Sequence, residues 1–314
     1  MSNDERDAPL LTAGFIATGV LAVSFSGPIA AASLAPALAI AFWRNAFGAM
    51  AGAPFTLTAR RVELSALMRE GRRALVLAVA AGAFLALHFG LWIPSLRLTT
   101  VTASTALVTT TPLFTVLLAK LRGTPVARGV LAGVLLALVG VVVITGVDAG
   151  ASADALRGDL MALGGGAAAA GYVACGEAVR RTVGTASYTL IAYTTCALVL
   201  LPVCLATGTA LWGFSARSWV EIAVLTLTAQ LLGHTLLNRA LRTAGATVVS
   251  LAVLLEVPGA SLVAWVWLGQ VPPLAVLPGA ALVLAGLAVV VRTQAAGRAR
   301  RVVTEVGNVT TVGA

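Results

Sequence analysis

The stretch TAGATVVSLAVLLEVPGASLVAWVWLGQ, from Thr243 to Gln270, is a long apolar run that carries one acid, Glu256, and one proline, Pro258, near its middle. A charge at the centre of a membrane-spanning helix costs about 2.5 to 3.5 kcal/mol, so it usually faces protein or a wet cavity. Proline removes a backbone donor and breaks a helix. Lipid tolerates such a break only where neighbours or cavity water satisfy the freed carbonyl. The stretch therefore predicts a broken membrane helix inside a bundle.

The same pattern occurs earlier in the chain, in TTVTASTALVTTTPLFTVLLAKLRGT from Thr99 to Thr124. The chain has only 2 histidines, and they coincide when the two stretches are superimposed. An offset of 146 residues aligns His88 with His234, Ser104 with Ser250, Pro112 with Pro258, and Gly123 with Gly269. We interpret the sequence as an internal duplication of about half its length.

The composition defines the class of protein. Hydrophobic residues make up 59% of the 314 residues, charged residues only 11%, and the mean hydropathy is +0.97. Soluble globular proteins have about 25% charged residues, so the composition indicates an integral membrane protein. A membrane helix needs about 20 mostly apolar residues. Ten stretches meet this requirement, near residues 12–32, 35–57, 74–93, 99–119, 129–147, 159–179, 187–208, 218–238, 245–267 and 271–291.

The predicted fold class is an all-α membrane protein whose ten transmembrane helices form two inverted five-helix repeats. Because five is odd, the two copies cross the membrane in opposite directions, as in many secondary transporters, with the substrate site near the midplane between them. The match of the first two helices with the sixth and seventh depends only on small residues and on Pro54 and Pro202. The predicted order is a cytoplasmic tail (1–11), the first repeat (12–147), an external loop (148–158), the second repeat (159–292) and a cytoplasmic tail (293–314).

The distribution of arginine predicts the orientation, since loops kept in the cytoplasm carry an excess of Lys and Arg. With the N-terminus inside, 17 of the 21 basic residues lie on the cytoplasmic side, and only Arg97, Arg157 and Arg217 lie outside. Tryptophans fall near the outer helix ends, as interfacial aromatics do, at Trp92, Trp212, Trp219, Trp265 and Trp267. Both termini are therefore predicted to be cytoplasmic, in a multi-pass protein of the cell (plasma or inner) membrane. The net charge of +9 then reflects topology, and no nucleic-acid partner is predicted.

Two charged side chains lie near the middle of predicted helices. Arg44, in AIAFWRNAFGAM, is near the centre of the second helix, and Glu256 is near the centre of the ninth. Charges at this depth face the bundle interior, where they pair with one another or mark substrate and proton pathways. Two roles stay open for these residues: an ion pair between the repeats, or direct binding of a substrate or a proton.

Polar residues recur along the predicted eighth helix. Thr226, Gln230, His234 and Asn238 are four residues apart, the spacing of neighbours on one helix face. Such a stripe faces protein or a cavity, because lipid cannot satisfy polar groups, and we favour the cavity. For His88 in the third helix, a hydrogen bond between helices is the simpler alternative.

Threonines surround the first of the two predicted helix breaks, at Pro112 and Pro258. Thr109 and the two threonines that follow it directly precede Pro112. A threonine hydroxyl can donate to a carbonyl of the preceding helical turn, so local satisfaction of a kinked helix can explain them. The three cysteines, all within predicted spans, are expected to pack as small apolar residues.

These features together resemble the EamA family of the drug/metabolite transporter superfamily, over about residues 12–292. The resemblance is carried by the two five-helix halves, by the midmembrane arginine of AFWRNAFGA, and by a proline followed eleven residues later by a glycine in each half. It implies a ten-helix carrier of small metabolites or drugs, often moved outward, with a central cavity from helices three, four, eight and nine. The cavity residues that it implies are His88, Trp92, Thr109, Gln230, His234 and Glu256.

The predicted function is secondary-active export of small, amino-acid-like or amphipathic solutes by alternating access, with proton coupling through Glu256 as one option. The alternatives are a passive facilitator or exchanger without ion coupling, and a non-transporting membrane protein. The sequence has no zinc or nucleophile-elbow motif of an enzyme and no charge ring or filter loop of a channel. The predicted partners are a small-molecule substrate and the lipid bilayer. No cofactor or metal is predicted, and the oligomeric state is not specified.

Overall fold

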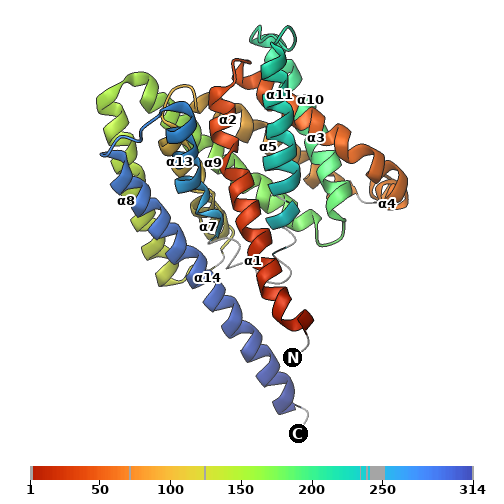
Figure 1. Ribbon diagram of the computed structural model, residues 1–314. Helices are drawn as coiled ribbons and strands as arrows, with labels where there is room; N and C mark the ends of the chain where they lie inside the picture. Colours follow the sequence, from red (N-terminus) through yellow and green to blue (C-terminus); the bar gives the residue numbers. More distant parts are fainter. Residues whose placement is uncertain are drawn as a thin grey trace.

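The computed structural model describes residues 3–70, 72–123, 125–233, 235–237, 240 and 252–312, and within these ranges it contains helices and no strands. The helices form an elongated bundle, and the helices that carry the two chain ends, α1 (Asn3–Ser24) and α14 (Val276–Val312), both point away from the same end of it (Figure 1). His234, Asn238 and the stretch 241–251 lie outside the described residues.

Two successive groups of helices correspond to the two predicted halves. The first half contains, after α1, the helices α2 (Ser26–Ala32), α3 (Ala37–Ala59), α4 (Arg61–Glu70), α5 (Arg72–Ser95), α6 (Val101–Val108), α7 (Thr111–Leu121) and α8 (Arg128–Ala151). The second half contains, before α14, the helices α9 (Ala153–Val179), α10 (Thr185–Ala206), α11 (Ala216–Leu225), the π-helix η1 (Thr226–Gly233) and α13 (Glu256–Leu268).

Seven helical segments of the described chain are long and apolar enough to cross a membrane, which establishes a multi-pass membrane protein. They are Leu11–Ala32, Arg72–Ser95, Val101–Leu121, Arg128–Val147, Thr185–Ala206, Ala216–Leu237 and Val276–Gln294. Three more predicted spans correspond to α3 (23 residues), α9 (27 residues) and the shorter apolar helix α13. The count of ten stays a prediction.

The helix boundaries differ from the predicted tails and loop. Helix α8 ends at Ala151 and α9 begins at Ala153, so most of the predicted external loop 148–158 is helical. Helix α14 continues to Val312, through most of the predicted tail 293–314. This extension contains no proline, so no residue in it removes the backbone donor that a helix needs.

The spans that contain Pro112 and Pro258 are both interrupted just before the proline, whereas α3, α5 and α10 continue through Pro54, Pro94 and Pro202. Helix α6 ends at Val108 and α7 begins at Thr111, with Pro112 as its second residue. Helix α13 begins at Glu256, two residues before Pro258. In the first break the threonine hydroxyls donate to carbonyls of the preceding turn at 2.6 to 3.1 Å, from Thr109, Thr110 and Thr111. These bonds satisfy backbone oxygens that the break leaves without their usual donors.

Helices α8 and α14 make a long, close contact, the α8–α14 seam, which we define by Gly133 and Gly140 of α8 and Gly279 and Gly286 of α14. A Cβ atom at Gly140 would lie 2.5 Å from the Gly279 oxygen, and one at Gly286 would lie 2.5 Å from the Gly133 oxygen. The earlier glycine of each helix therefore meets the later glycine of the other, so the helices are antiparallel. They lie side by side in Figure 1. Only glycine permits this approach of two backbones.

The glycines of the seam are related by the same offset in residue number as the two broken spans. Gly133 and Gly279 are 146 residues apart, as are Gly140 and Gly286. The fully or nearly buried apolar residues of the seam follow the same rule, with Val130, Ala137 and Ile144 matching Val276, Val283 and Val290. The duplication that the prolines indicated thus extends to the last helix of each half.

Candidate functional site

One group of buried polar side chains surrounds Arg44 on α3. We call Arg44, Phe89, Tyr193, Gln230 and Glu256 the central polar cluster. The Arg44 side chain is only 2% exposed. Its Nε atom donates to Gln230 Oε1 at 3.0 Å, and its guanidinium carbon lies 4.1 Å from the centre of the Phe89 ring. Its Nη1 atom has no hydrogen-bond acceptor among the described residues.

Gln230 comes from η1, a π-helix, a form of helix that often marks functional sites. The residue is 3% exposed, and its Nε2 atom also lacks an acceptor among the described residues. The Tyr193 hydroxyl interacts with the Gln230 amide, at a geometry outside that of a full hydrogen bond to Nε2. A Cβ atom at Gly48 would lie 2.5 Å from Nε2. Glycine at this position, one turn after Arg44, therefore leaves the room that the amide occupies.

Glu256, the first residue of α13, is half-buried and interacts electrostatically with Arg44. The two side chains form no ion pair, since the ion pairs of the described chain join only other residues: Arg157 with Asp154, Arg181 with Glu177, and Arg217 with Glu221. The structure thus brings Arg44, Gln230 and Glu256 into one region, with Gln230 rather than Glu256 as the direct partner of Arg44.

His88 and Trp92 lie on α5, where it packs against α9. The His88 Nδ1 atom is 2.9 Å from the Gly165 oxygen, and its ring stacks on Trp92 with centroids 5.7 Å apart. Trp92 is 5% exposed. His88 therefore makes the hydrogen bond between helices that was the simpler alternative for it. The Thr109 hydroxyl bonds within its own helix, to the Ala106 oxygen.

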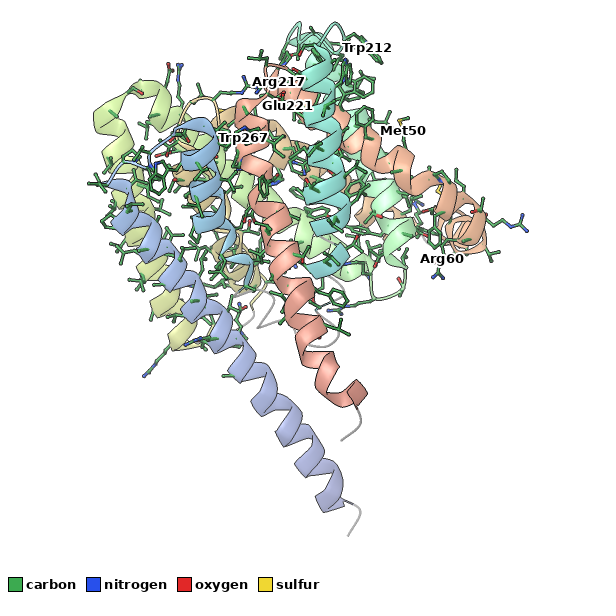
Figure 2. The ribbon with its side chains drawn as sticks, viewed as in Figure 1. Met50, Arg60, Trp212, Arg217, Glu221 and Trp267 are labelled. Atoms are coloured by element: carbon green, nitrogen blue, oxygen red, sulfur yellow. The ribbon has the colours of Figure 1, made fainter. Side chains whose placement is uncertain are left out.

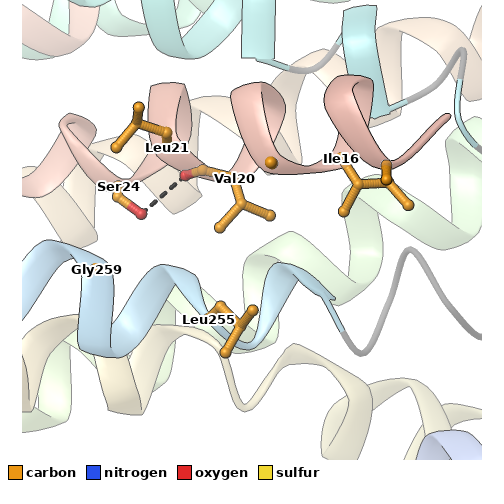
Figure 3. Close-up of a pocket in the computed structure, with 8 residues that line it drawn as sticks. Ile16, Val20, Leu21, Ser24, Leu255 and Gly259 are labelled. Atoms are coloured by element: carbon orange, nitrogen blue, oxygen red, sulfur yellow. Dashed lines mark hydrogen bonds between the residues drawn. The ribbon is translucent and has the colours of Figure 1, made fainter. Parts of the chain in front are cut away.

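A groove among the described residues lies away from the central polar cluster. It has a volume of about 480 Å³ and runs between α1 and α13 (Figure 3), and one side of it carries the Ser24 hydroxyl, which donates to the Val20 oxygen. The lining is otherwise apolar, and comprises Ala13, Ile16, Ala17, Val20, Leu21, Leu255 and Gly259. Among the residues expected to line a cavity, Trp92 and Gln230 are buried, His88, Thr109 and Glu256 are partly buried, and His234 lies outside the described residues. Each of these residues that the structure describes is therefore at least partly buried.

Sequence reasoning did not identify Phe89, Tyr193 or Gly48 as members or neighbours of the cluster. Gly48 follows Arg44 by four residues, so helical spacing could have placed both on one face. Phe89 directly follows His88 but is apolar, so nothing in the sequence marked it as a site residue. Tyr193 lies on α10, and only the packing of α10 against α3 brings it near Arg44.

A second polar group lies at the end of the bundle opposite the chain termini. Figure 2 shows Arg217 and Glu221 there, with Trp212 and Trp267 near the same end. Arg217 Nε donates to Glu221 Oε1 at 2.8 Å. Arg97 donates to the carbonyl oxygens of Ser33 and Ala35 beyond the end of α2. Partial burial lowers the pKa of the Arg97 guanidinium, and the Glu221 carboxylate opposes this shift.

An apolar helical bundle of two related halves, with buried polar side chains between them, defines a membrane protein of the transporter class. The chain belongs to the EamA-like transporter family: residues 10–146 and 156–292 each match the family model. This confirms the resemblance to the EamA family of the drug/metabolite transporter superfamily. The two matches are offset by 146 residues, like the glycines of the seam.

The fold is also similar to that of a solved structure titled "Crystal structure of protein". That chain is 22% identical and superimposes with a TM-score of 0.57, over 91% of this chain and 97% of the other. At this identity the similarity shows the fold alone. No curated protein matches the chain.

Proposed function

We propose that the protein is a secondary-active transporter that exports small, amino-acid-like or amphipathic solutes across the plasma (inner) membrane by alternating access. Membership of a transporter family supports the class. The observation that carries the proposal is the buried Arg44–Gln230 pair, whose donors are incompletely used in the middle of an apolar bundle. Polar groups buried at this depth are costly, and a binding site for a polar solute explains why they are there.

Ten spans arranged as two inverted repeats form part of this proposal. Helix packing supports a two-fold symmetry between the halves. Helix α5 of the first half packs on α9, the first helix of the second half, and η1 of the second half packs on α1, the first helix of the first half. Two helix pairs, α3 with α10 and α8 with α14, join helices at equivalent places in the two halves. This pattern is expected for a two-fold axis that passes between the halves. The central polar cluster, built from α3, α5, α10, η1 and α13, draws on both.

Alternating access requires contacts between the halves that can break. At the end of the bundle opposite the chain termini, the Thr102 hydroxyl donates to the Ser261 hydroxyl, and the Val101 amide donates to Gln270 Oε1, both at 2.9 Å. Both bonds join the N-terminal part of α6 to the region of α13 and the loop after it. In the proposed mechanism, these bonds hold this end of the bundle closed and break when it opens.

We propose that both termini are cytoplasmic, because 17 basic residues lie on the side of the predicted membrane that holds the termini and only three lie on the other side. Single cysteines in a cysteine-free variant test it with a membrane-impermeant thiol reagent on intact cells. A cysteine at Ser65 in α4 is expected to be protected, and one at Ser152 between α8 and α9 is expected to react. Labelling of the first and protection of the second would invert the orientation.

The test of the function is solute movement by purified protein in liposomes, with a panel of amino acids, nucleosides and cationic drugs. A secondary-active carrier should accumulate at least one solute against its gradient when a pH gradient is imposed. Movement that only equilibrates the solute would favour the passive facilitator. No movement of any solute by protein that is folded and inserted would refute a transport function.

A further inference from the structure

Two hydrogen-bond donors of the central polar cluster, Arg44 Nη1 and Gln230 Nε2, have no acceptor in full hydrogen-bonding geometry among the described residues. Both side chains are almost fully buried, at 2% and 3% exposure. The Phe89 ring covers the guanidinium 4.1 Å from its carbon. A ring face attracts a cation but accepts no conventional hydrogen bond and supplies no negative charge. The described part of the chain thus holds a buried cation without a directly bound anion, an arrangement that proteins usually avoid.

The orientation of the Gln230 amide follows from its partner. Arginine has donors only, so the oxygen of the amide must face Arg44 Nε, as the 3.0 Å bond has it. The NH₂ group is then directed away from that bond, as a second donor. The two residues together present donors and one positive charge, and their one acceptor atom, Gln230 Oε1, already accepts the bond from Arg44.

We infer that Arg44 and Gln230 form a carboxylate-binding subsite, so that the substrates of this carrier bear a carboxylate group. This inference depends on the proposed transport function for its biological meaning. Arginine and amide donors both suit carboxylate oxygens. The Glu256 carboxylate, within electrostatic range of Arg44, would repel a doubly charged phosphate more than a carboxylate. It is also placed to attract a positively charged group on the same substrate.

Matched probes test the subsite through the thermal stability of the purified full-length protein. Each pair has one carbon skeleton with and without the carboxylate: isovalerate with isoamylamine, and phenylacetate with phenethylamine. A ligand that binds only the folded state raises the Tm by mass action. We expect at least one carboxylate to raise the Tm of the wild type by a few degrees at saturation, and its matched amine to raise it less. No carboxylate-dependent rise in the wild type would overturn the inference.

Variants then locate the effect. Arg44→Gln should lose the response to carboxylates. Gln230→Glu places a carboxylate against Arg44 within the chain itself, so it should raise the Tm without ligand and also lose the response. Asn45→Ala is the matched control, because Asn45 is equally buried on the same helix and donates only to the Ala41 oxygen. It should keep the response, even at a lower starting Tm.

Glu256→Gln separates the inference from its main competitor, in which Glu256 itself supplies the anion to Arg44 in another conformation. The inferred subsite predicts that Glu256→Gln still responds to carboxylates. If Glu256→Gln lost the rise in Tm with carboxylates and Gln230→Glu kept it, the anion site would be assigned to Glu256. That result would overturn the inference.

The outcomes also separate this inference from the proposed function. If the protein transported amines and carboxylates equally in liposomes, the carboxylate subsite would be rejected and the transport function would stand. If carboxylates raised the Tm but no solute was transported, the subsite would be supported and the transport function would be rejected.

Discussion

The α8–α14 seam and the central polar cluster are both buried between the two halves of the chain, yet they are built in opposite ways. The seam consists of glycine and apolar side chains, and its backbones approach so closely that a Cβ atom at Gly140 would lie 2.5 Å from the facing carbonyl oxygen. The cluster contains an arginine, a glutamine and a nearby glutamate, and two of its donors have no acceptor among the described residues. The seam has glycine at both positions of each pair related by the offset of 146 residues, whereas the cluster is not repeated: the same offset relates Arg44 to Leu190 and Gln230 to Phe84.

This difference separates the frame of the protein from its site. In a bilayer, helix association depends on close packing, because lipid is as apolar as the side chains. A symmetric glycine seam supplies such packing and needs no charge. Polar groups in the same environment stabilise little and cost desolvation, so their presence requires another reason. The asymmetric positions of the polar residues fit a site that recognises an asymmetric solute.

The largest effect is expected from breaking the seam. Gly140→Leu forces a side chain into the space of the Gly279 oxygen and the Val283 amide, which lie 2.5 and 2.6 Å from the added Cβ atom. Overpacking of this kind costs about 1 to 3 kcal/mol or more. Thermal unfolding in detergent should show a large loss of stability. Gly146→Leu on the same helix is the control, since no atom lies within 4 Å of its Cβ position.

The symmetry of the seam sharpens this prediction. Gly286→Leu occupies the equivalent place in the second half and should destabilise as much as Gly140→Leu. Unequal losses, or a Gly146→Leu variant as unstable as Gly140→Leu, would show that the seam is not the frame that we describe.

The next effect is expected at the cluster, and on transport rather than on stability. Arg44→Gln removes the charge and the donor that we assign to the solute. Loss of one partner of a buried charged interaction costs about 2 to 5 kcal/mol, which corresponds to roughly 30-fold or more in affinity. Uptake into proteoliposomes should fall accordingly, while the Tm stays near that of the wild type. Normal uptake by Arg44→Gln would show that Arg44 is not part of the solute-binding site.

Glu256→Gln should uncouple transport rather than abolish it. Glutamine keeps the size and hydrogen-bonding capacity of glutamate and cannot ionise, so uptake should lose its response to an imposed pH gradient while exchange continues. If Glu256 only balances the charge of Arg44, the variant should instead express poorly, and the double variant with Arg44→Gln should restore expression. Full gradient-driven transport by Glu256→Gln would exclude a role for this residue in coupling.

The smallest effect is expected at the contact that closes one end of the bundle. Gln270→Ala removes the acceptor of the Val101 amide. A single lost hydrogen bond costs about 1 kcal/mol, so the closed conformation should be destabilised by that amount and the rate of exchange should change less than tenfold. Gln294→Ala, an exposed glutamine on α14, is the control and should match the wild type in both stability and exchange.

Much of the frame could be predicted from the residues themselves. Hydropathy indicated the membrane class, and the spacing of prolines, glycines and histidines indicated two halves offset by 146 residues. Both signals are local or repetitive, so they do not depend on which helices touch. Proline also indicated the breaks before Pro112 and Pro258, since it removes a backbone donor, but α3, α5 and α10 continue through their prolines.

The partners in the site could not be predicted in this way. The sequence indicated that Arg44 and Glu256 face the interior, and left open whether they pair. Tertiary packing gives Arg44 a hydrogen bond to Gln230 and a contact with Phe89 instead. Which side chain meets an arginine depends on the rotation and crossing of helices from different halves, and no spacing within one helix encodes that. The amino-acid sequence by itself thus determined the membrane class, the duplication and the depth of the charges, whereas only the tertiary structure decided which of the buried polar groups meet.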